Sequence, residues 1–133
     1  MSVTVSREEF EQIVERAIAG IPGKFRSRME NLYFAVEAWG PERDLLGLYE
    51  GRPLTERSVS DPFGQPDRIR VFQKPHEEMA RSREELEQIV ADTVWHEVGH
   101  YFGLNEFEIA RVEARRQRLR ALRGLGRAYN QKR

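Results

Sequence analysis

The feature that most constrains this chain is the eleven-residue motif His96-Glu97-Val98-Gly99-His100-Tyr101-Phe102-Gly103-Leu104-Asn105-Glu106. Residues four apart lie on one face of a helix, so His96 and His100 would present two imidazoles to the same side. Gly103 predicts the end of that helix, because glycine enters the left-handed conformation without a Cβ penalty. The chain can then fold back, and the motif therefore predicts that Glu106 returns toward the two histidines.

This donor set is typical of a catalytic zinc site, in which three protein ligands leave the fourth position to water. We predict Zn²⁺ bound by His96, His100 and Glu106, with metal-activated water and with Glu97 as general base. The chain has no cysteine, which excludes thiolate zinc sites and disulfides, and it has only three histidines. Two of those three lie in the motif, which favours zinc ligation over a chance match.

Length and composition predict a single soluble domain spanning residues 1–133. Charged residues make up 33% of the chain, as expected for a protein with a large charged surface. The N-terminus has no apolar stretch typical of a secretion signal, and no run reaches the length of a membrane span. We therefore expect a cytoplasmic protein without a membrane partner.

Three helices are predicted from apolar residues at helical spacing. The first spans residues 6–20 and the second residues 82–103, and each opens with a Ser-x-x-Glu capping box. The second helix is apolar nearly all round, which predicts a buried helix whose histidines face a cleft. A third helix begins at Phe107 and is expected to end at Gly124 and Gly126. Residues 124–133 are then expected to be a basic, partly flexible segment.

Three strands are expected, at Leu32–Trp39, Leu45–Gly51 and Arg68–Gln73. The last one alternates polar and apolar residues, which favours a half-exposed strand at the edge of the sheet. Pro53–Pro66 is rich in turn residues and is expected to form a loop, and Lys74–Arg81 is expected to be a connector. The fold class is therefore α+β.

Five further side chains are candidates for supporting roles. His76 is either a ligand or transition-state donor, or a solvated loop histidine. Asp92 precedes His96 by one helical turn, and is either an acceptor for the N–H of that ligand or a solvent-facing acid. Tyr49, Tyr101, His76 and Arg57 are candidates for stabilising the oxyanion.

The charge of the chain is uneven. From Ala110 to Arg133 there are nine basic residues and one acid, so this segment carries +8 and the rest of the neutral chain carries −8. Such a segment is either a solvated arginine face or a surface for nonspecific contact with nucleic-acid phosphates.

Two stretches of the chain resemble the minimal zincin-like metallopeptidases, small bacterial proteins long catalogued as a domain of unknown function. One is the His96–Glu106 motif, and the other is Leu45-Leu46-Gly47-Leu48-Tyr49-Glu50-Gly51-Arg52-Pro53-Leu54-Thr55-Glu56-Arg57-Ser58. The resemblance implies a reduced zincin fold: a small twisted sheet of three to four strands packed on an N-terminal helix and an active-site helix, followed by a C-terminal helix.

The same resemblance implies a zinc-dependent metallopeptidase that hydrolyses peptide bonds of a peptide or protein substrate. In that family the third ligand is usually an aspartate at the position of Glu106, so the longer glutamate is a departure. Metzincins share part of the motif but have a methionine turn downstream of it. Here all three methionines lie upstream, which excludes that group.

Two alternatives remain open from the sequence. One is a zinc-dependent RNA hydrolase, favoured by the basic segment but disfavoured by Glu97, which bacterial rRNA-processing endonucleases lack. The other is a zinc-binding regulatory module on a zincin scaffold, with negligible turnover, favoured by the small size of the chain.

Overall fold

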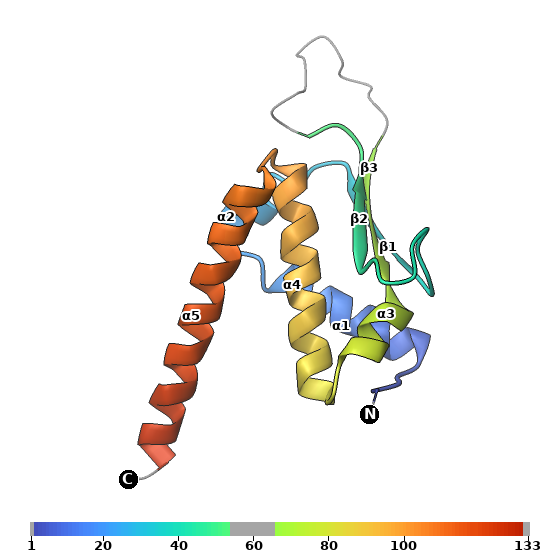
Figure 1. Cartoon of the computed structure of the whole chain (residues 1–133). Helices are drawn as coiled ribbons and strands as arrows, with labels where there is room; N and C mark the ends of the chain where they lie inside the picture. The colour runs from blue at the N-terminus through green and yellow to red at the C-terminus, as the bar shows by residue number, and fades with distance from the viewer. Residues whose placement is uncertain (1, 54–65, 132–133) are drawn as a thin grey trace. The chain divides into compact units, whose positions relative to one another are not determined.

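The structure is a computed structural model that describes residues 2–53 and 66–131, with side chains described as far as Arg123. The chain divides into two compact units, which we call unit 1, up to Gly103, and unit 2, from Leu104 onward. Unit 1 holds α1–α4 and the strands, and unit 2 holds α5 (Figure 1). The expectation of a single domain stays a prediction.

Helix α1 covers Arg7–Ala19, and it begins where the sequence predicts. The Ser6 hydroxyl accepts a hydrogen bond from the Glu9 backbone N–H at 3.0 Å, which satisfies one of the N–H groups left without a partner at a helix start. A short helix that the sequence did not predict, α2, follows at Gly23–Arg26, directly after Pro22.

The strands β1 (Leu32–Glu37), β2 (Gly47–Glu50) and β3 (Asp67–Phe72) form a mixed sheet among the described residues. The order is β1-β3-β2, with β1 parallel and β2 antiparallel to β3. Helices and sheet together confirm the α+β class.

The expectation that the third strand lies at an edge is wrong, because β3 is the central strand. Its alternating polar residues have another cause: they lie on the sheet face opposite the core. There Arg68 pairs with Glu50 at 3.0 Å and Arg70 pairs with Glu37 at 2.8 Å. The hydrogen bond from Arg70 also holds the pKa of Glu37 below its ordinary value. A half-exposed face gives the same alternation as an edge.

The expected connector after β3 is also wrong, because Gln73–Met79 forms helix α3. Pro75 lies in its first turn, where the missing N–H costs no helical hydrogen bond. His76 follows on the buried side of this helix.

Helix α4 covers Arg83–Tyr101, and the Ser82 hydroxyl accepts from the Glu85 N–H at 3.0 Å, as the capping box predicts. Figure 1 shows α4 beside the sheet, α1 packs against α4, and both helices contribute to one core with β3. The core residues of these three elements are Phe10, Ile13, Val14, Ile69, Val71, Leu86, Val90, Val94 and Val98. The prediction of a buried second helix is confirmed.

Unit 2 consists of the turn after Gly103 and helix α5, Glu106–Gln131. Asn105 and Glu108 cap its start reciprocally: Glu108 N–H donates to Asn105 Oδ1 at 2.8 Å, and Asn105 N–H donates to Glu108 Oε1 at 3.0 Å. The predicted end at Gly124 and Gly126 is wrong, because the helix continues through both. An isolated glycine costs a helix only about 1 kcal/mol and does not end it. None of the described helices has the length and apolar character that crossing a membrane requires.

Candidate active site

The two motif histidines lie one turn apart on the last two turns of α4. Their ring centroids are 5.0 Å apart with an interplanar angle of 71°. One ring nitrogen of His96 and one of His100 lie within 4.8 Å of each other, and both side chains are half-buried. Two ligands of one tetrahedral zinc, each about 2.1 Å from the ion, would be roughly 3.4 Å apart, a separation that falls within this limit.

Glu97 lies on the buried side of the same helix and is 8% exposed. Its Oε1 accepts a hydrogen bond from the backbone N–H of Tyr49 in β2 at 3.0 Å. The carboxylate next to the first histidine is therefore attached to the strand that runs beside α4. The sequence motif predicts the carboxylate but not this attachment.

A glycine allows the close approach of α4 to β2. A Cβ at Gly47 would lie 2.7 Å from Thr93 Cγ2 and 3.3 Å from Glu97 Cγ. A contact of 2.7 Å between carbon atoms is far below their optimal separation of about 3.5–4.0 Å, so any larger residue would require Thr93 or the strand to shift. Gly47 is thus a site residue that sequence reasoning missed, although it lies in the second stretch of the family resemblance.

The Tyr49 hydroxyl is engaged inside unit 1. It donates to Asp67 Oδ2 at 2.6 Å, and the ring meets the edge of Tyr101 with centroids 6.2 Å apart. Asp67 is 2% exposed and also accepts from the Arg52 backbone N–H at 3.4 Å. Asp67 was not singled out from the sequence, since a lone aspartate at a strand start carries no recognisable spacing.

The Tyr101 hydroxyl is likewise directed into the fold, because it lies 3.1 Å from the Arg28 carbonyl and 3.0 Å from the Glu30 carbonyl. The side chain is fully buried. These bonds give the hydroxyls of both tyrosines structural partners, so the structure offers no support for either as the oxyanion donor. Arg57, the remaining candidate besides His76, lies outside the described residues.

His76 is neither a solvated loop residue nor directed toward the histidine pair. It is fully buried, with Nδ1 2.6 Å from the Phe72 carbonyl and Nε2 2.8 Å from the Thr93 hydroxyl. A carbonyl only accepts, so Nδ1 carries the proton and Nε2 accepts from Thr93. Burial lowers the pKa of His76 from 6.5 to about 4, which keeps the ring neutral. Both ring nitrogens therefore serve the core, because α3 folds the side chain under α4.

Asp92 is half-buried on α4, four residues before His96. Its predicted role as an acceptor for the N–H of a ligand stays a prediction.

Gly103 has the conformation that the motif predicts, with φ +87°. Helix α4 ends just before it, and the Gly103 N–H donates to the His100 carbonyl at 2.9 Å. The chain leaves the helix through a left-handed glycine and reaches Glu106 three residues later, at the first position of α5.

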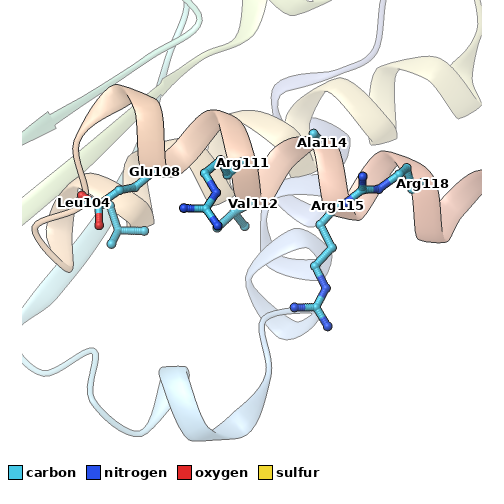
Figure 2. Close-up of a pocket in the computed structure, with 7 residues that line it drawn as sticks. All are labelled: Leu104, Glu108, Arg111, Val112, Ala114, Arg115 and Arg118. Carbon is cyan, nitrogen blue, oxygen red and sulfur yellow. The ribbon is translucent and has the colours of Figure 1, made fainter.

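Unit 2 carries a hollow of its own along the first half of α5 (Figure 2). Its described lining is Leu104, Glu108, Arg111, Val112, Ala114, Arg115 and Arg118. The three arginines are four and three residues apart, so they lie on one face of the helix. This face of α5 therefore carries three positive charges beside the hollow.

Comparison with known proteins places the motif in a family. The family model described as zincin-like metallopeptidase matches residues 29–116. A solved structure of a conserved hypothetical protein from Thermo thermophilus is similar, with 25% sequence identity and a TM-score of 0.52. The match covers 74% of this chain and 94% of that chain. No curated protein matches the chain. The paired imidazoles on α4, the adjacent carboxylate and a family match over most of the sequence agree, and the chain belongs to the zincin-like metallopeptidase family.

Proposed function

We propose that this protein is a zinc-dependent peptidase in which His96, His100 and Glu106 hold the metal and Glu97 is the general base. The observation that carries the proposal is the pair of adjacent imidazoles on α4, with the Glu97 carboxylate beside them on the same helix. Membership of the zincin-like metallopeptidase family supports it.

The donor set fits zinc, which is commonly bound by histidine nitrogens and a carboxylate. Glu106 is three residues past Gly103, so covalent geometry keeps its Cα within about 11 Å of that glycine. Gly103 has a left-handed φ, as expected of a glycine that ends a helix. When bound, zinc would activate a water molecule and polarise the substrate carbonyl.

The residues of the chain supply the proton transfers. Glu97 takes a proton from the attacking water and passes it to the leaving amine, as a general base that becomes a general acid. The substrate is proposed to be an extended peptide or protein segment that reaches the two histidines of α4.

Metal content and cleavage test the proposal together. Purified wild type should contain one zinc per chain by mass spectrometry, and Glu106→Ala should lower that content. Wild type should cut members of a peptide library, and the metal-free protein should cut none. Zinc at one per chain with no cleavage of any peptide would instead support the regulatory module.

The arginines of α5 give a reason to test the RNA alternative alongside. Arg111, Arg115 and Arg118 lie on one helix face and line the same hollow (Figure 2). Binding through them should weaken steeply with salt, as phosphate contacts do. We propose that this face makes nonspecific contact with nucleic acid, while the zinc site acts on peptides. Zinc-dependent cleavage of RNA that is lost in Glu97→Gln would support the RNA hydrolase instead.

A further inference from the structure

Tyr49 of strand β2 contacts helix α4 at two positions, and one of them is Glu97, the proposed general base. Tyr49 donates its backbone N–H to Glu97 Oε1 at 3.0 Å, across 48 residues of sequence. Its ring lies edge-on to Tyr101, which is one helical turn beyond Glu97 on α4. Strand β2 therefore contacts helix α4 at Glu97 and again one helical turn later, at Tyr101.

The side chain of Tyr49 is held in turn by a buried acid. Its hydroxyl donates to Asp67 Oδ2 at 2.6 Å, and Asp67 is 2% exposed. A hydroxyl-to-carboxylate bond of this length is in the range of the strong, charge-assisted hydrogen bonds. Asp67 is the first residue of β3, the central strand. Its hydrogen bond therefore attaches the side chain of Tyr49 to the middle of the sheet.

Gly51 leaves the space that Asp67 occupies. It has φ +152°, and a Cβ built there would lie 2.5 Å from the Asp67 carboxyl group. A side chain at this position would both strain the backbone and displace the carboxylate. Tyr49 thus holds Glu97, Asp67 holds Tyr49, and Gly51 leaves room for the Asp67 carboxylate.

We propose that Tyr49 is a positioning residue for Glu97 and that Asp67 holds Tyr49 in place, an inference that rests on the proposed function. A general base acts only when its oxygen lies within hydrogen-bond reach of the proton it takes. The bond from the strand fixes one oxygen of Glu97 and so determines where the other one points. Tyr49 acts through Glu97 and is assigned no contact with the substrate.

The experiment compares Tyr49→Phe and Asp67→Asn with matched controls elsewhere in unit 1. Tyr33→Phe removes a hydroxyl from a side chain of β1 that is 60% exposed, and Asp44→Asn alters an exposed acid. Zinc content, kcat and KM are measured on a library peptide that wild type cuts. Both test variants should keep one zinc and an unchanged KM, while kcat falls about tenfold, the size of effect typical for a residue that orients a site group. The controls should match wild type.

Amide hydrogen exchange on the metal-free protein supplies a readout that does not depend on turnover. The Tyr49 amide should be protected in wild type and should lose protection in Glu97→Ala, which removes its acceptor. Protection should also fall in Tyr49→Phe and Asp67→Asn. Gly51→Ala should reproduce the Asp67→Asn result, whereas Gly23→Ala should not, since a Cβ at Gly23 meets nothing within 4 Å.

Two outcomes overturn the inference. One is wild-type kcat in both Tyr49→Phe and Asp67→Asn with zinc retained. The other is a Tyr49 amide whose protection is the same in Glu97→Ala as in wild type. If wild type cuts no peptide, the proposed function fails, and the exchange measurement alone decides whether Tyr49 holds Glu97.

Discussion

His76 and the pair His96 and His100 have the same side chain in two regions of unit 1, with opposite surroundings. His76 is fully buried in α3, with one nitrogen on the Phe72 carbonyl and the other on the Thr93 hydroxyl. The pair is half-buried on α4, ring against ring. The difference teaches that the role of a histidine is set by what encloses it. Helical spacing brings two imidazoles together at a surface, whereas a histidine without such a partner is used here as a polar core residue.

The largest effect that separates the two regions should be on zinc. We expect His100→Ala to abolish stoichiometric zinc, because two ligands hold the ion much less well than three. His76→Asn should keep one zinc per chain, since its nitrogens contact only the core. Mass spectrometry of the purified variants measures both. Full zinc retention in His100→Ala would remove the site as described.

Glu97 extends the comparison within α4. It lies between His96 and His100 in the sequence, but its side chain is on the buried side of the helix. We expect Glu97→Gln to keep the metal and to lose cleavage by about 10²–10⁴-fold, the usual contribution of a general base. Glutamine keeps an oxygen for the Tyr49 N–H but cannot take a proton. The measurement is kcat on a cut peptide with zinc content in parallel, and cleavage at the wild-type rate would show that another group is the base.

Acid should affect the core histidine specifically. The pKa of His76 is about 4 in the folded protein against 6.5 when unfolded, so the unfolded chain takes up the proton first as the pH falls. The stability that depends on neutral His76 is therefore complete above pH 6.5 and is lost progressively toward pH 4. Between about pH 7 and pH 5 the loss should be about 2 kcal/mol, at about 1.4 kcal/mol per unit of pKa difference.

Urea unfolding of metal-free protein at these two pH values measures that loss, with His76→Asn as the control. Both proteins keep His96 and His100, so any contribution of the pair cancels in the comparison. Glu37 titrates below this window, because its pKa is lowered from 4.5. An equal loss of stability in His76→Asn and wild type would show that His76 is not the acid-sensitive group.

The smallest effect concerns the turn that follows the pair. Gly103 has φ +87°, and Gly103→Ala should cost roughly 1 kcal/mol in strain. Zinc should also bind more weakly, because the turn determines where Glu106 lies. A zinc competition titration and a melt of the metal-free protein measure the two effects, with Gly23→Ala as the matched control. Unchanged zinc affinity in Gly103→Ala would argue against Glu106 as third ligand.

The features that the sequence predicts correctly are local ones. The capping boxes at Ser6 and Ser82 start their helices as expected, and Gly103 has its left-handed conformation. Each depends on residues within about one helical turn, so a short stretch of sequence contains the whole physical cause. The paired histidines belong to the same class, since their adjacency follows from the helix itself.

The features that sequence analysis missed are contacts between distant segments. The burial of His76 depends on α3 packing under α4, and the central place of β3 depends on strands on both sides of it. The attachment of Glu97 to Tyr49 joins residues 48 positions apart. Neither the periodicity nor the capping residues of a sequence predict such pairings. The hydrophobic pattern determines which face of an element is buried, but not which other element covers that face.

The order of the strands also has a consequence for how the protein folds. Neither β1 nor β2 can find its place alone, since β3 lies between them and pairs with both. The register joins Leu32 to Asp67 and Glu50 to Arg68, so each pairing requires the closure of a loop before any contact rewards it. Helices form within about a microsecond, whereas sheets built from such distant partners assemble far more slowly. On a growing chain, β2, whose Tyr49 contacts Glu97, therefore cannot take its place in the sheet until β3 has been synthesised.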